Sequence, residues 1–397
     1  MKRLRTQLVL FAGARTVVNT AYRMVYPFLP VLARGLGVDL KAMSAALSLR
    51  SASGALGPLL APISDRRGRK FGLTLGLGLF TAGALAAFLG PGFAVFTVAL
   101  VLMTVGKYVF DPAVLAHFGD NVPYERRGMV LAITELSWSL AFVLGVPAAG
   151  FMIARFGWRS PFLALACLGF AALASIRWLF PGNGRAGTFG TAAPGPQEAP
   201  GGRRPGHRES YKAVFASPAA LAGLAVIFFS GMGNEVVNVI FGVWLEDSFG
   251  LKLAALGAAS AIIGVSEFGG ESLVAATVDR LGKTRALMIG LSANAAVALA
   301  LPLGGHTVLA ALVGLTLFYL TFEYTVVSII PVMSEILPRS RATLLGFYAA
   351  AFSLGRAFGS LAAPWLYEIG FRAVTLAAVG LDVLAILALV RLRRLTE

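Results

Sequence analysis

The chain has 397 residues, of which 57% are hydrophobic and only 13% are charged, and its net charge is +15. Its mean hydropathy is +0.78. Soluble domains usually carry about a quarter charged residues, so this composition excludes a soluble protein and requires that most of the surface faces lipid.

Apolar stretches long enough to cross a bilayer, roughly 20 residues each, recur from residues 8–36 through to residues 373–390. We count about twelve of them, and none shows the period-two alternation of barrel strands. The sequence therefore predicts an all-α integral membrane protein with twelve transmembrane helices. The basic N-terminal tail runs straight into the first stretch without a small-residue cleavage site, which predicts an uncleaved first helix.

The basic residues are divided unevenly between the two sides of these spans. One set of loops and tails carries 23 of the 34 Lys and Arg residues, and the opposite loops carry six. The positive-inside rule places the first set, with both termini, in the cytoplasm of a multi-pass protein of the cell (plasma) membrane. Membrane topology thus explains the charge, and no nucleic-acid partner is expected.

Ionisable residues inside the predicted spans are costly and mark functional sites by default. Helical spacing puts Arg15, Asn19 and Arg23 on one face of the first span, and Lys107 beside Asp111 in the fourth. Snorkelling of Arg15 to the cytoplasmic surface and a purely structural Lys107–Asp111 pair are the alternatives. The candidates in the N-terminal half are Arg15, Asn19, Arg23, Tyr26, Arg50, Lys107, Asp111, Glu135 and Trp138.

A Pro-, Gly- and polar-rich segment over residues 181–210 interrupts the hydrophobic pattern near the middle of the chain. Because such a composition cannot bury a core, it predicts a flexible cytoplasmic linker. It separates an N-terminal bundle of six helices, residues 1–180, from a C-terminal bundle of six, residues 211–397.

The spans of the C-terminal half are rich in acids. Glu267 and Glu271 are like charges four residues apart on one helical face, which in a low-dielectric site favours a proton on at least one of them, as a proton carrier needs. Closed structural pairs and inter-helix braces are the alternatives. The candidates here are Glu235, Asn238, Glu267, Glu271, Glu323 and Arg356.

The two sets of charges are lopsided. The N-terminal set has four cations and two acids, whereas the C-terminal set has four acids and one cation. If both sets line a shared cavity, one wall is positive and the other negative. His117, His207 and His306 lack metal spacing, and Cys167 is expected to be free and buried. With no nucleophile triad or phosphate-binding loop either, we expect no metal, no cofactor and no enzyme activity.

The two halves repeat each other. The DRRGRK run at residues 65–70 recurs as DRLGKTR at residues 279–285, and Asp120-x-x-Pro123 recurs as Glu335-x-x-Pro338. The FGWR run at residues 156–159 recurs as IGFR at residues 369–372. Three matches at offsets of 213 to 215 residues indicate an internal repeat of six helices.

The loop at residues 57–70, with its Gly, Leu, Asp, Arg and Gly positions, resembles the signature motif of the major facilitator superfamily, and the resemblance extends over the whole chain. It implies two six-helix bundles that rock about a central cavity, and usually a monomer. Gly57 is expected to let helix backbones approach closely, and Asp65 to pair with Arg69 or cap a neighbouring helix. The resulting latch, which would stabilise the outward-facing state, comprises Gly57, Asp65, Arg66, Gly68, Arg69, Asp120, Asp279 and Gly282.

Gly145, Pro147 and Gly150 in the fifth span are similar to the antiporter motif of that family, although Val146 separates the glycine from the proline. Ordinary close packing is the alternative explanation for these small residues. The motif points toward export.

These observations predict a secondary transporter that uses protons to export small organic compounds, similar to the twelve-helix drug:proton antiporter branch of the family. The alternative is a transporter or flippase of a zwitterionic or amphipathic metabolite, such as a lysolipid or a sugar derivative, with Arg23, Arg50 or Lys107 holding its anionic group. A third class, a non-transporting membrane protein with this fold, remains open because fold alone does not fix function.

Overall fold

The computed structural model describes residues 2–60, 62–122, 124–179 and 207–396. The regular structure in these ranges is helical, and ten helices are long and apolar enough to cross a membrane. Two further rods complete the predicted twelve. The first is rich in arginine, and the second is broken into short helices at Gly54, Gly57 and Pro62, so neither has one long apolar run. The predicted fold class is confirmed.

The N-terminal half begins with α1 (Lys2–Arg23), which continues through a turn into α2 (Leu29–Leu36). The second rod consists of α3 (Leu40–Ser53), η1 (Gly54–Leu56), α4 (Gly57–Leu60) and α5 (Pro62–Arg67). The remaining rods of this half are α6 (Arg69–Leu89), α7 (Gly92–Asn121), α8 (Tyr124–Leu140) with η2 (Ala141–Gly145) and α9 (Val146–Phe156), and α10 (Ser160–Leu179).

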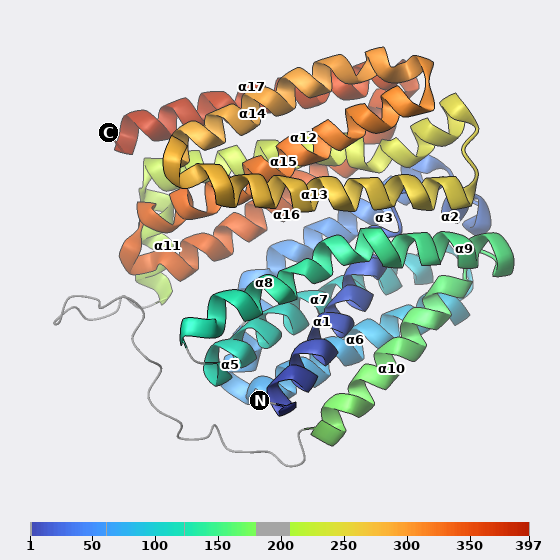
Figure 1. Cartoon of the computed structure of the whole chain (residues 1–397), viewed down its shortest axis with the longest axis horizontal. Coiled ribbons are helices and arrows are strands. Elements are labelled where there is room, and N and C mark those ends of the chain that lie inside the picture. Colours follow the sequence, from blue (N-terminus) through green and yellow to red (C-terminus); the bar gives the residue numbers. More distant parts are fainter. Residues whose placement is uncertain (1, 61, 123, 180–206, 397) are drawn as a thin grey trace.

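The C-terminal half follows the short helix α11 (His207–Ala216). Its rods are α12 (Pro218–Phe249), α13 (Leu253–Leu281), α14 (Lys283–Ala300) with η3 (Leu301–His306), α15 (Val308–Ile336), η4 (Pro338–Ser340) with α16 (Arg341–Ile369), and α17 (Phe371–Thr396). Figure 1 shows the N-terminal helices below and the C-terminal helices above, with both chain termini toward the left. We call that end of the bundle the terminal end and the opposite end the far end.

Matched glycines turn the chain at equivalent places in the two halves. Gly37 and Gly250 lie at the far end with φ of 69° and 62°, and Gly68 and Gly282 lie at the terminal end with φ of 92° and 81°. A third pair, Gly157 and Gly370, also has positive φ. Since a side chain is disfavoured in this conformation, the repeat seen in the sequence has a structural cause.

Two ion pairs lie at equivalent places at the terminal end, one within each half, and the first of them joins two residues of the predicted latch. Arg69 donates to Asp120 at 2.8 Å, and Lys283 pairs with Glu335 at the equivalent place. Asp279 is exposed. The side chains of Asp65 and Arg66 lie outside the described part of the structure, so their predicted roles stay predictions.

The predicted close approach at Gly57 is wrong. A Cβ atom there would meet only the Tyr108 ring, at an ordinary 3.6 Å. The tight packing lies one turn earlier, at Gly54, where a Cβ atom would stand 2.5 Å from the Ser353 hydroxyl and 2.6 Å from that of Tyr108. The break in the helix at η1 brings this earlier glycine to the seam between the halves.

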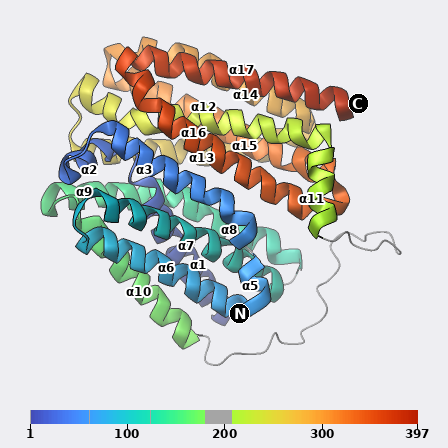
Figure 2. The ribbon, with the colours of Figure 1, turned by 180° about the vertical axis from the view of Figure 1, so that it is seen from behind.

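At the far end the two halves are in close contact. Gly242 of α12 lies against the backbone of Pro27, and a Cβ atom there would be 2.7 Å from its carbonyl oxygen. A Cβ atom at Gly257 of α13 would stand 3.1 Å from Cα of Pro147. The view from behind shows α3 alongside α16 (Figure 2), the helices that pack most extensively between the halves on that side.

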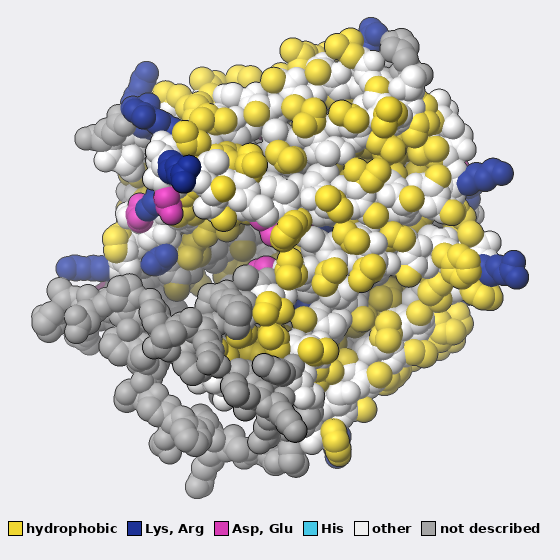
Figure 3. Space-filling model, viewed as in Figure 1, with side chains coloured by type: hydrophobic (Ala, Val, Ile, Leu, Met, Phe, Trp, Pro, Cys, Tyr) yellow, Lys and Arg dark blue, Asp and Glu magenta, His cyan; other side chains and the backbone are white. Residues whose placement is uncertain are grey.

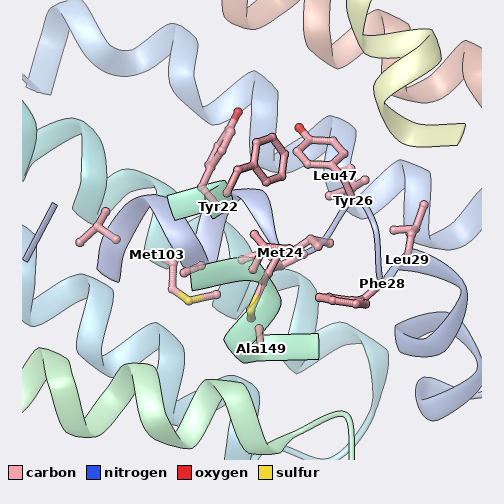
Figure 4. Packing of buried hydrophobic residues seen from close by; sticks show 14 of the residues in the cluster. Tyr22, Met24, Tyr26, Phe28, Leu29, Leu47, Met103 and Ala149 are labelled. Carbon is pink, nitrogen blue, oxygen red and sulfur yellow. The ribbon is translucent and has the colours of Figure 1, made fainter. Parts of the chain in front are cut away.

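The end of α1 anchors the N-terminal half. Tyr22, Met24, Tyr26 and Phe28 are buried, and Figure 4 shows them among side chains of neighbouring helices, including Met103. Large side chains thus fix the turn that leads from α1 to α2, so that the two tyrosines face the other half.

Two sequence predictions need correction. The linker was placed over residues 181–210, yet α11 already begins at His207; residues 180–206 lie outside the described residues. Cys167 is free as expected but exposed, not buried. It lies on α10, whose outer face meets lipid, where a small apolar thiol is tolerated as readily as in a core.

Candidate functional site

A cavity of about 220 Å³ lies between the two halves. Figure 3 shows the surface hollowed at the corresponding place between α8 and α13, toward the terminal end, with acidic side chains visible in the hollow. Both halves contribute to its wall. The lining residues are Tyr22, Arg23, Tyr26, Glu135, Trp138, Phe142, Asn234, Asn238, Glu267, Glu271, Tyr319, Phe322, Glu323, Val326, Phe352 and Arg356.

Arg23 crosses from α1 to the other half. Its guanidinium forms an ion pair with Glu267 of α13, and lies 4.1 Å from the ring centre of Trp138 and 3.6 Å from that of Phe142. Both charged side chains are buried. The second carboxylate oxygen of Glu267 has no partner within the described residues, so it keeps a free acceptor at the cavity.

Two more carboxylates face Glu267 without a cation of their own. Glu271 lies one helical turn further along α13, as the spacing predicted, and Glu323 of α15 lines the same wall. The contact at Gly270 explains their closeness: a Cβ atom there would stand 3.0 Å from Cβ of Glu323. No hydrogen bond or ion pair of Glu271 or Glu323 is found with another described residue. Three carboxylates therefore share one cation, Arg23.

A second cluster joins the halves through the Tyr26 hydroxyl. That oxygen accepts from Arg50 at 2.5 Å and from Arg356 at 2.6 Å, and donates to Glu235 at 2.9 Å. Glu235 is fully buried and also accepts from Arg356 at 2.7 Å and from Ser360 at 2.9 Å. Both oxygens of this carboxylate accept hydrogen bonds, so Glu235 links the turn after α1 to α16 in this conformation.

The remaining charges of the N-terminal half form their own network. Arg15 pairs with Asp111 at 3.2 Å and with Glu135 at 2.9 Å, and Lys107 pairs with Asp111 at 2.5 Å. Asn19 accepts from Lys107 at 2.6 Å. Arg15 is thus paired inside the bundle and does not snorkel, and the predicted Lys107–Asp111 pair is confirmed.

The sequence predicted one positive and one negative cavity wall, and the prediction of a positive wall is wrong. Arg15 of α1 and Lys107 of α7 are neutralised inside the N-terminal half, because Asp111 of α7 pairs with both cations and Glu135 of α8 pairs with Arg15. Asn19, Arg50 and Lys107 are absent from the cavity wall, whereas the other predicted cavity residues, Arg23, Tyr26, Trp138, Asn238 and Arg356, all line it.

Sequence reasoning missed three lining aromatic residues, Phe142, Tyr319 and Phe352. Tyr319 lies four residues before Glu323, and Phe352 lies four before Arg356, so each shares a helical face with a charged residue already singled out. That spacing was the signal that could have found Tyr319 and Phe352. The Tyr319 hydroxyl donates to Asn238 at 2.8 Å and holds that amide at the wall.

The antiporter-like segment lies at the seam between the halves. A π-helical turn at Ala141–Gly145 precedes it, in which the Val146 N–H bonds to the Ala141 carbonyl five residues earlier. Gly145 lies tightly against Thr20 of α1, and Gly150 against Phe28 and the Leu253 carbonyl. These small residues permit close packing, and they also determine how α9 meets α13.

Comparison with known proteins places this architecture in a family. The model of the Major Facilitator Superfamily matches residues 11–330 and 228–397. The chain is 26% identical over 392 residues to an uncharacterised MFS-type transporter, YwfA of Bacillus subtilis, with 96% of this chain and 88% of the relative covered. It is 32% identical to Multidrug resistance protein 2 of the same organism, over 29% of this chain and 28% of that one.

Solved structures agree with the fold. A bacterial homologue of the human lysosomal transporter Spinster, in an inward-facing and occupied conformation, matches with a TM-score of 0.74 at 14% identity, over 100% of this chain and 97% of that one. The class defined by fold and cavity is that of a multi-pass secondary transporter. This chain belongs to the Major Facilitator Superfamily.

Proposed function

We propose that this protein exports small organic cations in exchange for protons. The observation that carries the proposal is the pair of cavity carboxylates, Glu271 and Glu323, which have no cationic partner among the described residues. Glu271 lies one turn from Glu267 on α13, and Glu323 of α15 approaches the same face at the Gly270 contact. Like-charged carboxylates in a low-dielectric site compete for protons, and a bound cation relieves the same repulsion. Proton and cation are therefore alternative occupants.

The aromatic side chains of the cavity suit such a cargo. Tyr22, Trp138, Phe142, Tyr319 and Phe322 contribute rings to its wall. A ring face attracts a positive charge, and the rings also cover the apolar part of an organic molecule. Acidic groups beside rings favour compounds that are both apolar and cationic. The partial match to a protein named for multidrug resistance is in line with this cargo.

Alternating access gives the exchange its direction. In the conformation described, the far end is closed by the contacts at Gly242 and Gly257. We propose that the terminal end, which carries most basic loops, faces the cytoplasm of the cell, as the positive-inside rule requires. In that orientation the cavity collects its cargo from inside and, as a monomer, releases it outside when protons return to the carboxylates.

The zwitterion alternative has less support. It needs a cation free to hold an anionic group, yet Arg23 is paired with Glu267, and neither Arg50 nor Lys107 lines the cavity. An anionic group entering there would meet an excess of carboxylates. The alternative therefore requires a rearrangement of α1 that the export of cations does not.

The test is transport of ethidium, a permanently charged aromatic cation, into proteoliposomes with an acidic interior. We expect Glu271→Gln and Glu323→Gln each to lower gradient-driven uptake by about tenfold, which corresponds to roughly 1.4 kcal/mol, because each amide removes one group that can bind a proton. The double variant Glu267→Gln with Glu271→Gln should abolish it. Glu209→Gln, on α11 outside the cavity, serves as the matched control and should transport normally.

Two results would end the proposal. One is a wild-type dependence on the pH gradient in the double variant, which would show that protons couple elsewhere. The other is preferential binding of a zwitterion over ethidium by the purified protein, with that preference lost in Arg23→Ala.

A further inference from the structure

Arg50 differs from the other cations buried within the bundle. Arg15, Arg23, Lys107 and Arg356 each lie within ion-pair distance of a carboxylate. Arg50 is only 1% exposed, yet the hydrogen bonds of its guanidinium to described residues go to the Tyr22 carbonyl, at 2.9 Å, and the Tyr26 hydroxyl, both of them neutral groups. Its Nε has no partner in the described part of the chain.

The aromatic rings beside Arg50 do not neutralise the charge of its guanidinium. Its guanidinium lies 4.1 Å from the ring centre of Tyr22 and 5.0 Å from that of Tyr26. Such contacts stabilise a cation but leave its charge in place. Glu235, the carboxylate on the same Tyr26 hydroxyl, is paired with Arg356, so the cluster of Arg50, Arg356 and Glu235 holds one positive charge in excess. A buried excess charge is costly in a low-dielectric interior, and a further negative partner would offset it.

A small cavity adjoins this group. It has a volume of about 10 Å³ and is lined by Val18, Ala21, Tyr22, Arg50, Leu100, Met103, Thr104 and Lys107. The volume suits one water-sized or monatomic occupant. Two of its lining residues are cations and none is an acid. Lys107 uses two of its three N–H donors, on Asn19 and Asp111, which leaves a third.

We infer that this cavity, between α1, α3 and α7, binds a single halide ion, with chloride the natural occupant. Arg50 Nε and the spare donor of Lys107 supply the hydrogen bonds, and Arg50 supplies the charge to be balanced. A water molecule would satisfy the donors but not the charge. Organic anions exceed the volume. Tyr22 contributes to the walls of both spaces, but neither Arg50 nor Lys107 lines the larger one, so the ion would be held outside the transport cavity.

The direct test is diffraction from crystals of the full-length protein grown in sodium bromide. We expect an anomalous peak between Arg50 and Lys107. Bromide peaks confined to the protein surface, or none, would overturn the inference and leave a water molecule as the occupant.

The solution test compares thermal unfolding of the detergent-purified protein in sodium chloride, sodium bromide and sodium gluconate of equal ionic strength. Both halides should raise the melting temperature by about 2 °C relative to gluconate. Ala21→Val, which fills the cavity without changing a charge, should abolish this halide-dependent difference. Ala33→Val, at another buried alanine of the same half, should keep it. Identical melting temperatures in the three salts for the wild-type protein would refute halide binding.

Discussion

Closure of the far end depends on the absence of a side chain at Gly242. A Cβ atom there would lie 2.7 Å from the Pro27 carbonyl oxygen and 2.8 Å from both Cα of Pro27 and the Tyr26 carbonyl oxygen. These are backbone atoms, which cannot turn aside as a side chain does. Since carbon contacts are optimal near about 3.5 Å, Gly242→Ala requires the halves to separate by roughly 0.8 Å at this point.

That separation shifts the equilibrium between the conformation with the far end closed and the conformation with the far end open. Overpacking of one methyl group costs about 1–3 kcal/mol, and the cost falls only on the state with the far end closed. The equilibrium should therefore move by a factor of about 5 to 150 toward the state with the far end open. Transport should slow, because the cycle must pass through both states.

Spin-label distances measure this shift. The single cysteine, Cys167, can be replaced by serine to give a background without cysteine. Labels at Arg155 and Lys252 report on the far end, and labels at Arg177 and Arg280 report on the region near the terminal end; all four positions are exposed. We expect the first distance to lengthen and the second to shorten in Gly242→Ala.

Gly233→Ala is the matched control for this experiment. It lies on the same helix, but a Cβ atom there meets α17 of its own half at an ordinary 3.4 Å. If Gly242→Ala folds and gives the same distance distributions as Gly233→Ala, the far-end contacts do not hold this conformation, and the reasoning from Gly242 fails.

Three further predictions concern thermal or denaturant unfolding of the purified protein. Tyr26→Phe should lower the free energy of unfolding by about 3 kcal/mol, because the lost hydroxyl removes one buried hydrogen bond from each of two guanidinium groups and one from a carboxylate. Ser360→Ala, which removes a single neutral donor, should cost about 1 kcal/mol, and equal losses would contradict the central role of the phenol. Asp111→Asn should cost about 3–5 kcal/mol, since it leaves two buried cations short of charge, and a loss below about 1 kcal/mol would argue against a closed network. Arg34→Ala removes the far-end ion pair with Glu246, at 2.9 Å, in which the arginine side chain is 62% exposed. The free energy of unfolding should therefore change by less than about 1 kcal/mol. A larger loss would show that this pair contributes more than its exposure indicates.

The fold followed from local signals in the sequence. The length of the apolar stretches predicted the transmembrane spans, and the matched glycines indicated the repeat. Both signals depend only on short stretches of chain. The two rods that lack one long apolar run show the limit of that signal: α1 carries Arg15 and Arg23 inside the membrane, where only their distant partners make them tolerable.

Within the candidate site, the sequence predicted only which residues of a single helix lie on the same face. Spacing along α13 correctly put Glu267 and Glu271 on one face, but nothing local joins them to Glu323, which arrives through the contact at Gly270. The same limit explains the wrong assignment of Lys107 to the cavity wall. The helical spacing along α7 correctly predicted that Lys107 pairs with Asp111. The orientation of α7 relative to the other half depends instead on packing among several helices.

The π-helical turn at Ala141–Gly145 sets which side of the fifth rod meets the other half. One surplus residue in a helix rotates all that follows by about 100°. Deleting one residue from this turn would restore a regular helix and swing Gly150 away from Phe28, bringing bulkier neighbours to the meeting point with α13. The number of residues between Trp138 and Pro147 is therefore itself constrained, because it keeps the cavity wall before the π-helical turn in register with the face of α9 that packs against α13 after it.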